Sequence, residues 1–153
     1  MAQKTLANAP DADAIFARLA RLTPDAARQW GTMTPNEMLC HLADSFRTPL
    51  GEQAPKPMSY MGIPAPLLKW LALSAPLKWA RGVKGAAESD PRREGTRPAQ
   101  FDADRERVVS MARRFLAEVT DQYPHPMFGP MTRADWMRWG WLHMDHHLRQ
   151  FGV

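Results

Sequence analysis

Hydrophobic residues recur along this chain at intervals of three and four, which is the period of an α-helix. Residues 11–22 (DADAIFARLARL) show this spacing directly after a proline and an aspartate, a typical helix start. Residues 23–30 begin with Thr-Pro and predict one further short turn of helix. No segment shows the strict alternation of a half-buried strand.

Two later helices have recognisable starting points. In residues 34–47, Thr34 is followed by a proline and then by Glu37, the spacing of a capping box with proline in the first helical turn. Thr132 and Asp135 repeat this spacing, and they predict a last helix that runs from Thr132 nearly to the end of the chain.

The middle of the chain alternates loops with apolar segments. Residues 48–64 and 84–100 are rich in proline, glycine and charged residues and are expected to be loops. Residues 65–83 predict a helix broken near Pro76, because proline removes a donor and clashes with the preceding turn. Residues 101–120 predict a long helix with one apolar stripe, formed by Val108, Met111, Phe115 and Val119.

Four substantial helices without strands predict an all-α fold, a helical bundle, in one domain spanning residues 1–153. The net charge of +4 is modest and its basic residues are scattered, so no nucleic-acid partner is expected. Cys40 is the only cysteine, which excludes an intramolecular disulfide. No segment resembles a signal peptide or reaches membrane-spanning length, so we expect a cytoplasmic protein without a membrane partner.

The candidate chemistry lies in the segment GWLHMDHHLRQFG, residues 140–152, which carries three of the five histidines. His143 and His147 are four residues apart, so a helix brings their imidazoles onto one face where both can bind one ion. A helical wheel puts them at the margin of the buried face, and Gly140 is expected to leave space beside them. The apolar stripe of this helix comprises Met137, Trp141, Met144, Leu148 and Phe151.

An isolated pair of this spacing is more often a solvated or core-margin pair than a metal site, because two ligands need a third from another element. Only His41 and His125 can supply it. His41 lies at the edge of the apolar face of helix 34–47, in the same relation to the core as His143, whereas His125 stands between two prolines. We therefore prefer His41.

The segments EMLCHLADSF (37–46) and HPMFGPMTRADWMRWGWLHMDHHLRQFG (125–152) resemble the DinB/YfiT-like superfamily, in a branch of small bacterial proteins of mostly uncharacterised function. The resemblance implies a four-helix bundle and one divalent metal ion. The ligands that it implies are His41, His143 and His147. Zinc is the first expectation, with nickel and iron as alternatives.

Other residues near the histidines have two interpretations each. His146 is a candidate proton shuttle or a surface residue, and Gln150 is a candidate partner of a ligand imidazole or a helix cap. Trp136 and Trp139 are candidate walls of a substrate pocket, against the alternative of ordinary core residues. Cys40 is expected to be a small buried residue, and His125 is expected to be a turn element.

Three functions are compatible with such a site. Related superfamily members include metal-dependent transferases of low-molecular-weight thiols, so a thiol transferase acting on a small electrophilic substrate comes first. A hydrolase that uses a metal-bound water and a non-catalytic metal-binding or stress-response protein are the alternatives. A homodimer is compatible with each of them. The glutamate that zinc proteases place after the first histidine is missing, since position 144 is methionine, and no glycine-rich phosphate loop opens a helix.

Overall fold

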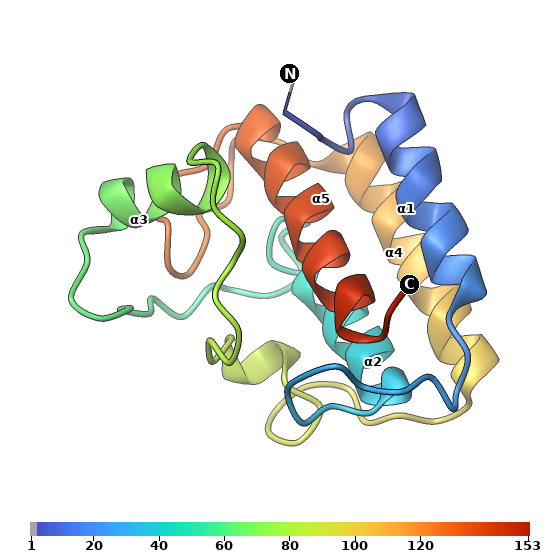
Figure 1. The fold of residues 1–153 in the computed structure, drawn as a ribbon. Helices are drawn as coiled ribbons and strands as arrows, with labels where there is room; N and C mark the ends of the chain where they lie inside the picture. Colours follow the sequence, from blue (N-terminus) through green and yellow to red (C-terminus); the bar gives the residue numbers. More distant parts are fainter. Residues whose placement is uncertain (1–2) are drawn as a thin grey trace.

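The computed structural model describes residues 3–153, and every regular element in that range is helical (Figure 1). The all-α prediction is therefore confirmed, with no strand in the described part of the chain. One isolated bridge joins His125 and Gly129. The elements are α1 (Ala9–Arg21), α2 (Pro35–Ser45), α3 (Ala65–Leu73), the 3₁₀ turn η1 (Ala87–Ser89), α4 (Phe101–Glu118) and α5 (Arg133–Gln150).

There are five α-helices in the described range, one more than the four of the expected bundle. Helices α1, α2, α4 and α5 pack around a common hydrophobic core, with α2 against α4 and α1 against α5. Helix α3 contacts α5 but stands away from the other helices, at the left of Figure 1. The largest buried side chains of the core include Trp136, Phe46, Phe115, Ile15, Leu19 and Leu148.

Both predicted capping boxes are present. The Thr34 hydroxyl accepts a hydrogen bond from the Glu37 amide while the Glu37 carboxylate accepts one from the Thr34 amide. Thr132 and Asp135 make the same reciprocal pair at the start of α5. These bonds satisfy amides that the first turn of a helix leaves without partners, so both helices begin where the sequence predicts.

Two local predictions are wrong. Residues 23–30 form a turn and loop rather than a turn of helix. Their backbone groups form hydrogen bonds to α5 instead, since Gln29 N donates to Gln150 O and Trp30 O accepts from the Gln150 side-chain amide. In residues 65–83 the predicted break near Pro76 is confirmed, since the helix ends at Leu73, but the helix expected after the break is absent. The chain there continues as an extended segment towards η1.

Helix α5 is more deeply buried than its sequence indicates. No residue from Trp136 to Gln150 is exposed, so the histidines lie inside the molecule rather than at the margin of a buried face. Gly140 does not leave space at the histidines either. A Cβ atom at Gly140 would lie 2.8 Å from Leu6 Cδ1 and 3.0 Å from Phe115 Cε1, so this glycine permits close packing on the other side of α5.

Among the described residues, no helix combines the length and the apolar character needed to cross a membrane.

Candidate metal centre

Three imidazoles from two helices meet in the interior. His41 lies on α2, and His143 and His147 lie one turn apart on α5. Their ring centroids are 4.6 to 5.0 Å apart, and one nitrogen of each ring lies within 4.8 Å of the other two. The preference for His41 over His125 as the third member of this group agrees with the geometry.

Hydrogen bonds fix which nitrogen two of these rings turn towards the centre. His41 Nδ1 lies 2.8 Å from the carbonyl oxygen of Ser89 in η1, which can only accept, so Nδ1 carries the proton. Gln150 donates its amide nitrogen to Trp30 O at 2.9 Å, so its oxygen faces His147 Nδ1 at 3.1 Å. The Nε2 atoms of His41 and His147 therefore keep their lone pairs.

His143 is held differently. Its Nε2 lies 3.0 Å from His41 Nε2, and its ring stacks on Trp139 at 4.8 Å between centroids. His143 Nδ1 is buried and has no hydrogen-bond partner in the described structure. Since the proton of His41 sits on Nδ1, His143 Nε2 donates to His41 when nothing else occupies the centre.

Burial keeps the three histidines neutral. It lowers the pKa of His41, and it places the pKa values of His143 and His147 well below the usual histidine value. Mutual repulsion of the protonated imidazoles lowers the latter two further. Neutral imidazole is the form that binds metal ions, so the cluster is suited to binding a cation rather than an anion.

The donor set fits a divalent transition metal. Imidazole nitrogens suit zinc, nickel, copper and iron, and catalytic zinc sites commonly have three protein ligands and an open position. The Ser89 carbonyl and the Gln150 amide form hydrogen bonds to Nδ1 of His41 and of His147, the ring nitrogens that point away from the centre. Such hydrogen bonds commonly orient histidines that bind metal ions. These three buried histidines can therefore hold one metal ion.

A comparison with sequence families returns one described as "Protein of unknown function (DUF1569)", which matches residues 1–152. The chain belongs to this family. DUF1569 is grouped with the DinB/YfiT-like families, in agreement with the motifs on α2 and α5. Searches of curated proteins and of solved structures find no match to the chain.

In this DUF1569 protein His125 and Cys40 do not belong to the three-histidine cluster. His125 Nδ1 accepts the backbone amides of Met127 and Phe128, its ring stacks on Phe128, and burial lowers its pKa to about 3. It is the turn element that the sequence predicts. Cys40 is buried, and burial raises the pKa of its thiol to about 12, so it is not a nucleophile near neutral pH.

A cavity of about 740 Å³ opens beside the three histidines. The candidate wall residues Trp136 and Trp139 both border it, as do His146 and Gln150. His146 Nδ1 is buried without a hydrogen-bond partner in the described structure, and burial lowers the pKa of its ring. His146 is thus a neutral imidazole that lines the cavity and lies outside the three-histidine cluster.

Sequence reasoning missed two further aromatic walls. Trp30 and Trp79 flank His146, with ring centroids 5.8 and 6.1 Å from its own. Both residues lie in segments for which the sequence predicted helix, and only the extended course of these segments brings the rings to the cavity. The Trp79 indole donates to Ala72 O at the end of α3, which fixes its position.

Asp44 was also missed, although it lies three residues after His41. Its side chain is fully buried and accepts hydrogen bonds from the Thr96 amide, the Thr96 hydroxyl and Arg107. These contacts tie the end of loop 84–100 to α2 and α4. They hold the loop that carries Ser89, so Asp44 supports the orientation of His41 indirectly.

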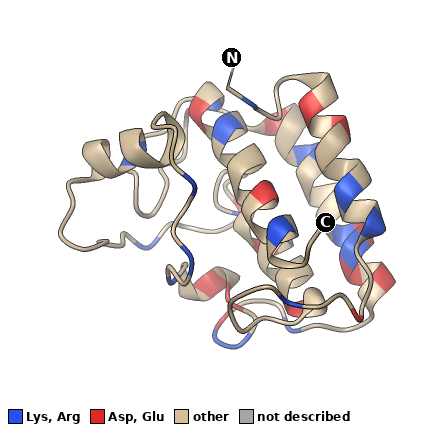
Figure 2. Cartoon of the chain, in the orientation of Figure 1, with Lys and Arg blue, Asp and Glu red and all other residues tan. Residues whose placement is uncertain are grey.

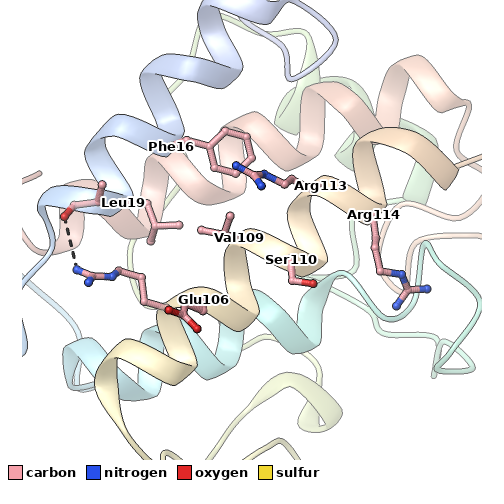
Figure 3. Close-up of a pocket in the computed structure, with 9 residues that line it drawn as sticks. Phe16, Leu19, Glu106, Val109, Ser110, Arg113 and Arg114 are labelled. Atoms are coloured by element: carbon pink, nitrogen blue, oxygen red, sulfur yellow. Dashed lines mark hydrogen bonds between the residues drawn. The ribbon is translucent and has the colours of Figure 1, made fainter.

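A second depression, of about 520 Å³, lies between α1 and α4 (Figure 3). Its lining contains no histidine or cysteine, and one dashed contact joins Arg105 to Ala20 O. Its lining holds one carboxylate, Glu106, and one hydroxyl, Ser110, among three arginines, so it has no cluster of metal ligands and no histidine to activate the hydroxyl. The chemistry of the molecule is therefore concentrated in the larger cavity.

Proposed function

We propose that His41, His143 and His147 bind one divalent metal ion and that the protein transfers a low-molecular-weight thiol to an electrophilic small molecule. In this proposal α1, α2, α4 and α5 are the four-helix bundle of a DinB/YfiT-like protein, and α3 is an addition to it. The observation that carries it is the meeting of three neutral imidazoles, two of them with their metal-binding nitrogens fixed by Ser89 and Gln150.

A bound divalent cation would supply positive charge that keeps a thiol sulfur as thiolate near neutral pH. Three protein ligands leave positions at which such a co-substrate can enter. The nucleophile then comes from the co-substrate, which suits a chain whose own thiol at Cys40 is buried and has a raised pKa.

His146 is the proposed proton acceptor. It lines the cavity beside His147, with ring centroids 5.2 Å apart, and burial lowers the pKa of its ring, so the neutral imidazole has one nitrogen free to accept a proton. The thiol proton passes to this nitrogen, the sulfur forms a bond to the electrophilic carbon, and the leaving group departs with its electron pair.

The cavity wall favours an apolar electrophile. Tyr60, Ile63, Leu68, Leu71 and Phe128 line it together with the tryptophans. Such a wall buries the carbon skeleton of a substrate and keeps water away from the thiolate, which limits competing hydrolysis.

The activity can be measured with 1-chloro-2,4-dinitrobenzene, which releases chloride and forms a coloured thioether. We expect zinc-loaded protein to accelerate this reaction with at least one of several low-molecular-weight thiols, above the uncatalysed rate. The metal-free protein and His41→Ala should not accelerate it, whereas Cys40→Ser should.

Binding of the thiol can be followed separately with cobalt in the centre. A saturating sulfur-to-metal charge-transfer band is expected when thiol is added. The band should be absent in His143→Ala and should persist in Cys40→Ser. Absence of both band and thioether formation, with metal-dependent hydrolysis of an activated ester, would replace the transferase by the hydrolase. Metal binding without either activity would leave a non-catalytic metal-binding protein.

A further inference from the structure

Residues 53–87, here called the arm, form a continuous segment without a single aspartate or glutamate. The arm includes α3 and the extended segments on either side of it, and it projects from the rest of the molecule. Figure 2 shows basic positions along it and no acidic ones. Its five cationic residues are Lys56, Lys69, Lys78, Arg81 and Lys84.

The arm also carries all the large hydrophobic side chains that are exposed in the described structure. They are Met61, Leu67, Trp70, Leu77 and Val83. Met61 is 81% exposed, Leu77 62% and Trp70 56%, which are high values for side chains of this size. Exposed apolar residues concentrated in one segment indicate a surface that contacts something else.

Helix α3 turns its apolar residues away from the protein. Lys69 faces the body, since its ammonium group contacts Pro130 O at 2.9 Å and the Asp135 carboxylate at 2.6 Å. Leu67 and Trp70 are three residues apart and share the opposite side of the helix. The outward side of α3 is therefore apolar, and its cation is used for attachment to α5.

The charges of the arm are only partly neutralised by the body. Lys56 pairs with Glu88 and Glu94, as Lys69 does with Asp135. Lys78, Arg81 and Lys84 take part in no ion pair of the described residues, although the Arg81 guanidinium lies over the Trp30 ring at 4.2 Å. A second copy would bring an identical arm that also lacks carboxylates, so the two arms could not neutralise each other's cations.

We propose that the arm docks on an anionic lipid surface. Apolar side chains and a tryptophan next to several lysines and arginines are the composition of segments that lie in the membrane interface. Lys78 and Lys84 would contact lipid phosphates while Leu67 and Trp70 enter the acyl boundary. The sequence-based expectation of no membrane partner rested on the missing spanning segment, which a surface contact does not require.

This docking would bring the metal cavity to the lipid interface, because the arm forms part of the cavity wall through Met58, Ile63, Leu71 and Trp79. It goes beyond the proposed transfer reaction and does not depend on it.

Flotation with lipid vesicles tests the proposal. The full chain should float with vesicles of phosphatidylcholine mixed with phosphatidylglycerol, and much less with phosphatidylcholine alone. Added salt should weaken the binding because it screens the cations. Trp70→Ser and the double variant Lys78→Glu/Lys84→Glu should each lower the partition coefficient, the latter by roughly tenfold or more. These residues are exposed, so both variants should keep the wild-type melting temperature and cobalt binding.

The double variant Arg21→Glu/Arg113→Glu is the matched control. It makes the same change in net charge at exposed positions on α1 and α4 and should float like the wild type. Failure of the wild type to float with anionic vesicles overturns the proposal, as does equal loss in both double variants. A dimer in sedimentation that Trp70→Ser dissociates would assign the patch to a second copy and would also overturn it.

Discussion

Gln150 connects three parts of the molecule through one side chain and its own backbone. Its amide oxygen contacts His147 Nδ1, its amide nitrogen donates to Trp30 O, and its backbone oxygen accepts from Gln29. A glutamine is well suited to this place, since it offers a donor and an acceptor on one planar group. It thus fixes the tautomer of a proposed ligand and anchors the loop that carries Trp30.

Replacing this residue tests its role in orienting His147. In Gln150→Leu we expect zinc affinity to fall about 10- to 100-fold, the usual effect of removing an outer partner of a ligand histidine. Competition titration with a chelating indicator measures it. Gln122→Leu, at an exposed loop position, is the control and should bind zinc like the wild type. Unchanged affinity in Gln150→Leu would show that His147 needs no such partner.

His125 makes the fold sensitive to acid. Burial lowers its pKa from 6.5 to about 3. Between pH 6.5 and pH 3 His125 is therefore protonated in the unfolded chain and neutral in the folded chain. Stability is therefore full above pH 6.5 and falls as the pH drops towards 3, by about 1.4 kcal/mol per pH unit for each such proton.

The variant His125→Asn isolates this contribution. Its side-chain oxygen can accept the amides of Met127 and Phe128 without taking up a proton. Urea denaturation with chelator present, between pH 6 and pH 4, should give a shallower loss of stability than in the wild type, by about one proton. Equal slopes would show that folding does not lower the pKa of His125.

At the scale of elements, α5 is largely buried, with no exposed residue from Trp136 to Gln150, and this limits what its sequence can reveal. The spacing of His143 and His147 and the Thr132 cap were readable because they depend on the helix alone. The burial of the histidines could not be predicted from the sequence, because it comes from the arm and from loop 23–33, which lack helical periodicity. Ser89 contributes only a backbone carbonyl, for which no residue type is required.

Gly140 gives a prediction for the packing of α5. Gly140→Ala should destabilise the protein by up to about 2 kcal/mol, since overpacking costs about 1–3 kcal/mol and the gain in helix propensity offsets about 1 kcal/mol. Urea denaturation measures the change. In the cycle with Leu6→Ala the two effects should be less than additive, because shortening Leu6 frees the space that the new methyl group needs. Additive effects would contradict the close approach.

For the whole molecule, the hydrophobic core and the metal centre are separate sources of stability. Buried apolar side chains from α1, α2, α4 and α5 form the core without any contribution from a metal. A small zinc domain, by contrast, obtains its folding free energy from the ion. The proposed ion should therefore raise the stability of a chain that already folds.

Chelation tests this separation. Removing metal with a chelator should lower the melting temperature by several degrees, since an ion at about 100 times its Kd contributes about 2.7 kcal/mol. Helical circular dichroism at room temperature should remain. Metal occupancy should also fall on acidification, because protonated imidazoles do not bind metal, and only at a pH below the usual histidine range, since burial lowers the pKa of all three rings. A coil spectrum after chelation would show that the core cannot fold by itself.

The burial of Cys40 has a practical consequence for studying the arm. Since this thiol is enclosed and is not ionised near neutral pH, it should not react with maleimide labels in the native state. A cysteine introduced at an exposed position such as Leu67 or Arg113 would then be the only labelled site, without removal of the natural one. A solvent-sensitive dye placed at each position in turn would report separately on the arm and on the opposite helices.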